Sequence, residues 1–275
     1  MRSLTALLII VLIAAGSGSE PKSRAAMISG GTFTPLYGVE KSDQTLVVNP
    51  FAIDRYPVTN KDFLDFVANH PAWAPDSQRD LLSDSNYLKH WEVRSKVYAP
   101  LDEDLNKPVV HVPWFAAADF CASRGGRLPT VLEWEFVAAA SETSHNASRD
   151  PVFVQQLLKW YSRPSGGTNQ IPEIGKSAPN AWGVHDLHGL VWEWTADFNS
   201  VFVAGDNRRE GEELKNLFCG AGAASGTDKA NYAAFMRYAL RNSLKGRYTT
   251  ANLGFRCAYD NETSTNNPKA GGKDL

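Results

Sequence analysis

Hydrophobic and polar positions alternate over short stretches of this chain, and no long helical repeat is present. Gly30 and Gly31 interrupt the first apolar run, so we expect a break in the strand that it forms. The run at 108–112 is mostly apolar, which favours a buried strand. In all, five apolar runs predict strands, and they cover residues 27–37, 46–53, 108–112, 235–240 and 254–258.

Three helices are predicted from the signals at their ends. Thr59 with Asp62, and Thr130 with Glu133, have the spacing of a capping box. In this motif a hydroxyl and an acidic side chain satisfy the first free N–H groups of a helix. Gly125 marks the end of a third helical stretch. The three helices are expected over residues 59–67, 115–124 and 130–140.

Two long segments show no clear period. Residues 70–107 have mixed polarity, and we expect an ordered connection with short helical pieces there. Residues 141–180 are polar and rich in turn-forming residues, and a dense aromatic stretch follows at 182–194. No clear linker divides the chain into two domains.

The first 19 residues have the three-part pattern of a secretory signal peptide. Arg2 is positive, residues 4–15 are apolar except for Thr5, and residues 16–19 are small. A helix over the apolar part is about 18 Å long, whereas the hydrocarbon core of a bilayer is roughly 30 Å thick. This favours cleavage over the alternative, a retained membrane anchor. We expect a periplasmic or secreted protein, without membrane attachment once the leader is removed.

A short segment flanks the domain at each end. Residues 20–26 are interpreted as a linker at the mature N-terminus. Residues 261–275 contain Ser, Thr, Asn, Gly and Lys without an apolar pattern, which predicts a disordered tail.

Composition narrows the class of protein. Lys and Arg number 28 against 30 Asp and Glu, so the net charge of −2 argues against a nucleic-acid-binding protein. Three cysteines among 275 residues are too few for a disulfide scaffold. Eight Trp, nine Tyr and 13 Phe occur with 21 Gly and 15 Pro. This mixture predicts an aromatic core under many irregular loops.

Several phrases, in order along the chain, carry a family resemblance. They are ISGGTF (28–33), DRYPVTNKDFLDFV (54–67), PVVHVPWFAAADFCASRGGRLPTVLEWEFVAAA (108–140), NAWGVHDLHGLVWEWTADF (180–198) and NLGFRCA (252–258). Together they resemble the formylglycine-generating enzyme superfamily, also called sulfatase-modifying factors, over nearly the whole mature chain. Residues 70–107 and 233–246 look most like a bacterial subgroup often associated with copper nitrite reductase loci, called NirV-like. The resemblance implies an α+β fold related to C-type lectins, with little regular secondary structure. It also implies one domain, over residues 27–260.

The resemblance also assigns roles to the three cysteines. Family members with cysteines at the positions of Cys121 and Cys257 join them in a disulfide, so we expect that bridge; the alternative is two buried free thiols. Cys219 is then left over. It is interpreted as a nucleophile or soft metal ligand in the cleft, or as a small buried hydrophobic residue.

The copper site of the family is not expected here. Formylglycine-generating enzymes hold Cu(I) between two cysteines, because this ion prefers soft thiolate ligands. An ungapped count back from LGFRC puts those positions at Asp228 and Ala233, and neither is a cysteine. The usual conversion of a cysteine to formylglycine is therefore not expected, and neither is copper at that site.

Other positions of the family's cleft are retained. Trp192 matches the Trp of the WEW motif, Ser225 matches a Gly-Gly-Ser element, and Arg241 matches an arginine that lines the cleft. They are candidates to bind a peptide-like or carboxylate ligand. The alternative is structural: a core tryptophan, a turn serine and an arginine in a salt bridge.

A calcium site is expected in the turn before and within the WEW motif. The resemblance places side-chain oxygens of Asp186 and Glu193, and backbone carbonyls of Gly189 and Val191, around one ion. Calcium prefers such hard oxygen ligands. The alternative is a turn held by its own hydrogen bonds. The family's second calcium site has no counterpart in 141–175 and is expected to be absent.

The histidines give no strong metal signal. His185 and His188 flank Asp186, but a third ligand at a suitable spacing is missing for a zinc or iron site. His111 is expected to be a core or rim histidine.

Three functions remain open from the sequence. The first is an exported oxidoreductase-type maturation factor that acts on a secreted protein or metabolite without the copper site. The second is a non-catalytic accessory factor for an exported enzyme, such as a copper enzyme. The third is a calcium-dependent, lectin-like binding module.

Overall fold

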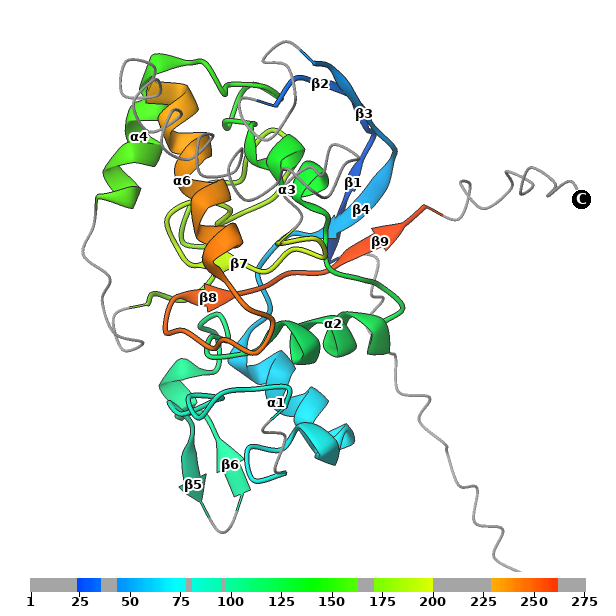
Figure 1. The fold of residues 1–275 in the computed structure, drawn as a ribbon, viewed down its shortest axis with the longest axis vertical. Coiled ribbons are helices and arrows are strands. Elements are labelled where there is room, and N and C mark those ends of the chain that lie inside the picture. The colour runs from blue at the N-terminus through cyan, green and yellow to red at the C-terminus, as the bar shows by residue number, and fades with distance from the viewer. Residues whose placement is uncertain are drawn as a thin grey trace, which may run out of the picture.

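Three short strands form a sheet that joins the two ends of the domain (Figure 1). Strand β4 (Phe51–Asp54) lies between β1 (Ala25–Ile28) and β9 (Ala258–Asp260), and both pairings are antiparallel. The computed structural model describes residues 24–35, 44–77, 81–94, 97–162, 171–199 and 229–261. The predicted leader therefore lies outside the described residues, as does all of the predicted tail except Asn261.

The first strand begins earlier than expected. Strand β1 starts at Ala25, inside the predicted linker, because Ala26 is 1% exposed and packs in the core. Arg24 binds the carboxylate of Asp62, which anchors this start to a helix. The expected break follows at Gly30, which has a φ of +71°. A side chain at Gly30 would collide with the carbonyl oxygen of Val48, so only glycine fits this approach.

A second pair of strands continues from this break. Strand β2 (Gly31–Phe33) pairs antiparallel with β3 (Leu46–Val48). The predicted strand over 46–53 is thus divided between β3 and β4, and Asn49 and Pro50 separate the two parts.

The predicted capping boxes are confirmed. Helix α1 (Asn60–Asn69) begins after Thr59, and helix α3 (Val131–Ala138) begins after Thr130; in both, the hydroxyl and the acidic side chain bind reciprocally. Helix α2 (Trp114–Ser123) ends before Gly125, as expected.

The predicted disulfide is also confirmed. Cys121 of α2 is bonded to Cys257, which lies just before β9, with 5.4 Å between the Cα atoms. Both residues are fully buried. The core around them is aromatic: Phe63 and Phe66 of α1 pack on Phe120 of α2, with ring centroids 5.8 and 5.3 Å apart. The bridge therefore joins two segments 136 residues apart inside the main core.

Two helices lie where the sequence pattern predicts other structure. Helix α4 (Pro151–Tyr161) lies within the segment expected to be turns, and helix α6 (Lys229–Ser243) covers the predicted strand 235–240. Asp150 caps α4 and Pro151 is its first residue, which together are a helix-start signal within the polar segment. In α6 the buried positions recur at helical spacing, and local apolar content alone does not distinguish this from a strand. Figure 1 shows α4 and α6 side by side, next to α3.

The segment 108–112 is buried as predicted but forms no regular strand. Val109 donates its backbone N–H to Val58, whereas His111 donates to Thr250, so the segment lies between two different partners. His111 has a φ of +56°, which breaks the extended backbone there.

The long connection over 70–107 contains short elements. They are the 3₁₀ helices η2 (Pro71–Trp73) and η3 (Asp102–Asp104), and a hairpin of β5 (Glu92–Arg94) with β6 (Val97–Ala99). The hairpin was not foreseen. It protrudes near α1 in Figure 1.

Near the centre, β7 (Trp192–Glu193) pairs in parallel with β8 (Leu253–Gly254). The predicted strand over 254–258 is therefore divided between β8 and β9. Among the described residues, no helix has the length and apolar character needed to cross a bilayer.

Candidate functional site

A buried ion-pair network joins α3 to α6. Glu135 of α3 binds Arg237 at 2.6 Å and Arg241 at 2.7 Å, and all three side chains are less than one-tenth exposed. The two arginines are four residues apart on α6, so both lie on the helix face toward Glu135. Burial alone would raise the pKa of Glu135, but the two guanidinium groups lower it to about 2. Glu135 is thus ionised at neutral pH, and the trio has one excess positive charge.

Aromatic side chains surround this network. Arg241 lies over the Trp134 ring, with 4.6 Å from its guanidinium carbon to the ring centroid. Arg237 donates a hydrogen bond of 2.9 Å to the hydroxyl of Tyr161. The Tyr161 ring in turn stacks on Trp192, with centroids 5.3 Å apart and planes at 7°. Two of the residues predicted for the cleft, Trp192 and Arg241, therefore belong to one connected cluster.

Two aromatic residues of α4 pack against the side chain of Trp192. Trp160 lies 4.7 Å from Trp192 between ring centroids, in addition to the stacked Tyr161. Trp192 is half-buried, whereas Arg241 is only 5% exposed. For Arg241 this arrangement matches the structural alternative, a salt bridge.

The turn predicted to bind calcium holds its two acidic side chains through protein donors. Both oxygens of Glu193 accept from Arg256, with a shortest contact of 2.8 Å, and Oε2 also accepts from the Trp134 indole at 2.8 Å. Asp186 accepts from the backbone N–H of Gly175 at 2.6 Å and from the Ser177 hydroxyl at 2.5 Å. The two carboxylates thus have separate sets of donors.

The oxygen atoms of this turn meet the requirements of a calcium site only in part. Asp186 and Gly189 adopt positive φ values of 59° and 95°, so the backbone turns sharply at both positions. Val191 is 1% exposed, and Glu193 already neutralises a buried guanidinium. The turn is therefore closed by its own contacts, and calcium there stays a prediction.

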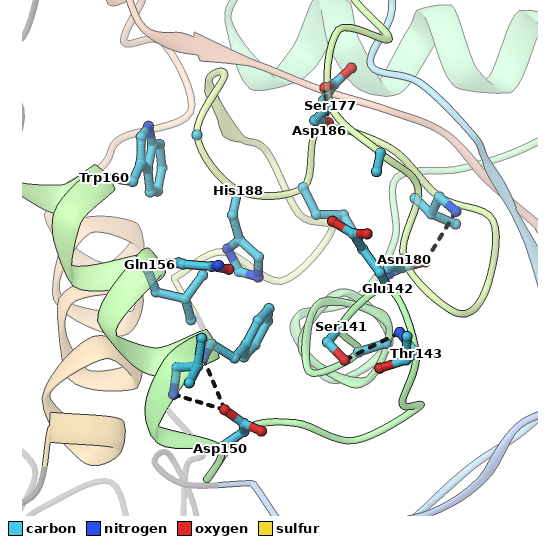
Figure 2. Close-up of a pocket in the computed structure, with 18 residues that line it drawn as sticks. Ser141, Glu142, Thr143, Asp150, Gln156, Trp160, Ser177, Asn180, Asp186 and His188 are labelled. Atoms are coloured by element: carbon cyan, nitrogen blue, oxygen red, sulfur yellow. Dashed lines mark hydrogen bonds between the residues drawn. The ribbon is translucent and has the colours of Figure 1, made fainter.

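A cavity of about 530 Å³ lies between α4 and the loop over 177–189 (Figure 2). His188 projects into this space, and its Nε2 atom lies 2.8 Å from the Ala138 carbonyl oxygen. Burial, with a smaller contribution from Arg237, lowers the pKa of His188 to about 4. The imidazole is therefore neutral at physiological pH.

The two other histidines considered in the sequence, His185 and His111, serve local structure. His185 contacts the Ser177 carbonyl oxygen through Nδ1 and stacks on Tyr56, with ring centroids 4.6 Å apart. His111 is buried, with its Nδ1 near the Thr249 carbonyl oxygen. Within the described ranges, no group of three or more His, Cys, Asp or Glu side chains is arranged to hold a metal ion.

Comparison with known proteins identifies the family. The model of the sulfatase-modifying factor enzyme 1-like domain matches residues 14–261. The chain belongs to this family, the formylglycine-generating enzyme superfamily. The α+β fold expected from the sequence, with its little regular secondary structure, is thereby confirmed.

Relatives of the chain include proteins with and without the named activity. An inactive C-alpha-formylglycine-generating enzyme 2 from Bos taurus is 28% identical over 93% of this chain and 96% of its own length. A formylglycine-generating enzyme from Thermomonospora curvata is 24% identical over 85% of this chain and 92% of its own. The structure of PvdO from Pseudomonas aeruginosa covers 86% of this chain and 94% of its own, with 16% identity and a TM-score of 0.46.

The copper position that can be described does not fit copper. Ala233 lies on α6, is 2% exposed and has a methyl side chain that cannot bind a metal. Its carbonyl oxygen accepts a hydrogen bond of 3.2 Å from Arg237. The second copper position, Asp228, lies outside the described residues, as do the cleft candidates Cys219 and Ser225.

The sequence pattern did not predict a role for four residues. Glu135, Tyr161 and Arg237 belong to the cluster around Arg241, and Arg256 binds Glu193. Glu135 and Arg237 had a usable signal, since each puts a charged group on the apolar-facing side of a helix. Glu135 and Arg237 bind each other but are 102 residues apart in the sequence, and no local pattern connects them.

Proposed function

We propose that this chain is an exported maturation factor of the formylglycine-generating enzyme superfamily that acts by binding its client, without copper–thiolate chemistry. The observation that carries the proposal is the buried alanine at 233. A thiolate pair is what holds Cu(I) in the family, and a methyl group cannot replace one of its two ligands.

The contacts around Trp192 and Arg241 support binding of a client protein over oxidation of a substrate. In the described part of the chain, both cysteines are joined in the Cys121–Cys257 disulfide, so neither supplies a free thiol. Arg241 is engaged by Glu135, and Trp192 is supported by α4. These contacts make a rigid surface with a half-buried indole. An inactive relative that covers nearly the whole chain agrees with this function.

The exported compartment and the client are parts of the same proposal. The leader pattern at 1–19 favours export. The subgroup resemblance favours a client among exported copper enzymes, such as a nitrite reductase. The alternative function, an oxidoreductase that acts on a secreted metabolite, would need a redox group outside the described residues. Cys219 is the candidate for that group.

The first experiment tests the chemistry. The purified mature chain is incubated with Cu(I), oxygen and a peptide that carries a sulfatase-type cysteine, and aldehyde is detected with a hydroxylamine probe. An authentic formylglycine-generating enzyme is the positive control. We expect no aldehyde above the no-protein blank, and aldehyde formation with turnover would contradict the proposal.

The second experiment tests the binding role in cells. The gene is deleted, and the copper content of exported copper enzymes is measured per protein. We expect reduced copper loading that the wild-type gene restores and Trp192→Ala restores less well. Unchanged loading in the deletion strain would contradict a role in maturation of these enzymes.

A further inference from the structure

A second cavity lies along one side of strand β2. It has a volume of about 360 Å³ and is lined by residues 29–33 together with Phe136, His145, Asn146 and Trp182. Successive side chains of a strand point to opposite faces, so a cavity that touches consecutive residues runs along their backbone. The residues of β3, all of them described, do not line it. The cavity therefore lies on the side of β2 that faces away from β3.

This side of β2 is a free strand edge. Among the described residues, β2 pairs with β3 alone, and residues 31–33 make no backbone hydrogen bond outside that ladder. In an antiparallel pair, part of the N–H and C=O groups of each strand points away from the partner. Gly31 and Thr32 are exposed, and a Cβ atom added at Gly31 would contact only the Phe136 ring, at 3.8 Å. Another chain can therefore approach the backbone here.

The edge lacks the features that usually prevent pairing with another chain. Natural proteins protect free edges with lysine, other charged side chains or proline. Residues 25–34, which include β1 and β2, contain none of these. The hydrogen-bonding groups of β2 are therefore open to a further strand.

The opposite wall of the cavity is aromatic and is held in place by local contacts. Trp182 packs on Phe136, with ring centroids 5.5 Å apart, and the exposed His145 lies over Trp182 at 4.1 Å. The Asn146 side-chain oxygen accepts from the Ser148 N–H at 3.1 Å and from its hydroxyl at 2.7 Å. The wall is thus formed before any ligand binds.

The charge of the lining selects the occupant. None of the residues that line the cavity is Asp, Glu, Lys or Arg. A charged group in this space would lose water without gaining an opposite charge. The alternating N–H and C=O groups of a strand edge are complementary to those of another extended backbone. Together these features favour an uncharged peptide segment with an apolar side chain.

We propose that the free edge of β2 binds an extended, uncharged segment of another protein as an additional strand. The segment pairs with the backbone of residues 31–33, and one of its side chains packs on Trp182 and Phe136. This surface is separate from the one around Trp192, and the proposal does not rest on the client-binding function proposed above.

The first test compares two peptides on the purified mature chain by fluorescence anisotropy. The probe is Thr-Val-Phe-Val-Thr, capped at both ends and labelled with a neutral coumarin dye. The matched peptide has the same side chains but is N-methylated at every amide, so it has no backbone N–H to donate. We expect the unmethylated peptide to bind at least about tenfold more tightly, because strand pairing needs these donors. Equal affinity would overturn the proposal.

Two lysine substitutions identify the edge. Thr32 and Val47 are cross-strand partners, and both are exposed, but only Thr32 lines the cavity. We expect Thr32→Lys to weaken peptide binding about tenfold and Val47→Lys to leave it unchanged. Weaker binding in Val47→Lys with wild-type affinity in Thr32→Lys would overturn the location, because the bound edge would then belong to β3. Circular dichroism checks that both variants fold.

Two histidine substitutions test the aromatic wall. His145→Ala removes the ring over Trp182, and we expect it to weaken binding about threefold. The matched control is His70→Ala, because His70 is also an exposed histidine on an aromatic ring, that of Phe66, and lies outside the cavity lining. Equal affinities of the two variants would overturn the role of this wall.

Hydrogen exchange measured in the wild-type protein locates the pairing directly. We expect saturating peptide to slow the exchange of backbone amides in residues 31–33 and to leave those of β5 unchanged. Unchanged exchange in residues 31–33 would overturn the proposal. Sedimentation of the peptide-free protein tests the other occupant, a second copy of this chain. A dimer that Thr32→Lys dissociates would also overturn the proposal, because the edge would then be occupied by that copy.

Discussion

Glu193 and Arg256 form an ion pair in which both side chains are fully buried, with 2.8 Å between Oε1 and Nη2. The pair joins the WEW motif to the LGFR motif across 63 residues. The same guanidinium donates to the carbonyl oxygens of Asp54 and His185, so one side chain ties the sheet, the turn and the central strands together. The remaining donors of Arg256 are thus satisfied, as a buried cation requires.

Arg256→Met should strongly destabilise the protein. The substitution leaves the Glu193 carboxylate buried without its cation, which costs about 3–5 kcal/mol in comparable pairs. The measurement is the free energy of unfolding in urea. The control is Lys176→Met, which removes the exposed pair of Lys176 with Glu173 and should leave the unfolding free energy unchanged within error. Similar effects of the two substitutions would contradict the structural role of Arg256.

Calcium at the turn over 186–193 is tested by metal analysis and thermal unfolding. If the ion binds, calcium at about 100 times its Kd raises the stability by about 2.7 kcal/mol, and EGTA reverses the rise. Asp186→Asn keeps an oxygen ligand and should keep the calcium effect, whereas Asp186→Ala should remove it. Absence of calcium from the purified protein, together with no shift on its addition, would show that the turn is held by hydrogen bonds alone.

Stability should fall as the pH drops below about 6.5, in part through His90. Burial, and then the nearby His111, lower the pKa of His90 from 6.5 to about 4 in the folded protein. The unfolded chain takes up this proton first, so the stabilisation is complete above pH 6.5 and is lost as the pH falls toward 4. The pKa of His111 is lowered by burial in the same direction, and Asp104 opposes the shift of His90.

His90→Gln tests this pH dependence. The loss of unfolding free energy between pH 7 and pH 5 should be smaller than in the wild type by about 1–2 kcal/mol, since each extra proton contributes about 1.4 kcal/mol per pH unit. His145→Gln changes an exposed histidine and serves as the control. An identical pH profile for His90→Gln and the wild type would contradict the prediction.

Loss of the disulfide should reduce stability substantially without changing the fold. The bridge closes a loop between Cys121 and Cys257, 136 residues apart, and the chain-entropy model assigns such a loop about 4–5 kcal/mol. We expect the double serine variant to unfold at lower urea concentration. The native protein should resist mild reductants, because both sulfur-bearing residues are fully buried. Reduction at equal rates in native and unfolded protein would contradict this burial.

Helix starts show how far local sequence reasoning goes in this fold. Thr59 and Thr130 were identified correctly because a capping box is complete within four residues. Asp150 with Pro151 is an equally local helix-start signal, but it lies in a segment whose polar, turn-forming composition favours loops. The segment 235–240 is different, since its short apolar run is compatible with both helix and strand.

The candidate site was only partly accessible to the same reasoning. The family motifs located Trp192 and Arg241, and the structure places both in one cluster. They did not indicate that Arg241 forms a buried ion pair with Glu135, or that α4 supplies the ring that stacks on Trp192. Both facts depend on how α4 and α6 pack against α3.

The family, the capped helices and the mismatch at Ala233 follow from the chain alone, because each depends on residue identity at short spacing or in a long ordered set of motifs. The family resemblance then predicted the cysteine pair. Only the tertiary structure decided which charges meet: Glu135 with Arg237 and Arg241, and Glu193 with Arg256. It also decided that Nδ1 of His188 is buried without a partner among the described residues. The physical reason is that burial and pairing depend on neighbours distant in the chain, which packing brings within 3 Å.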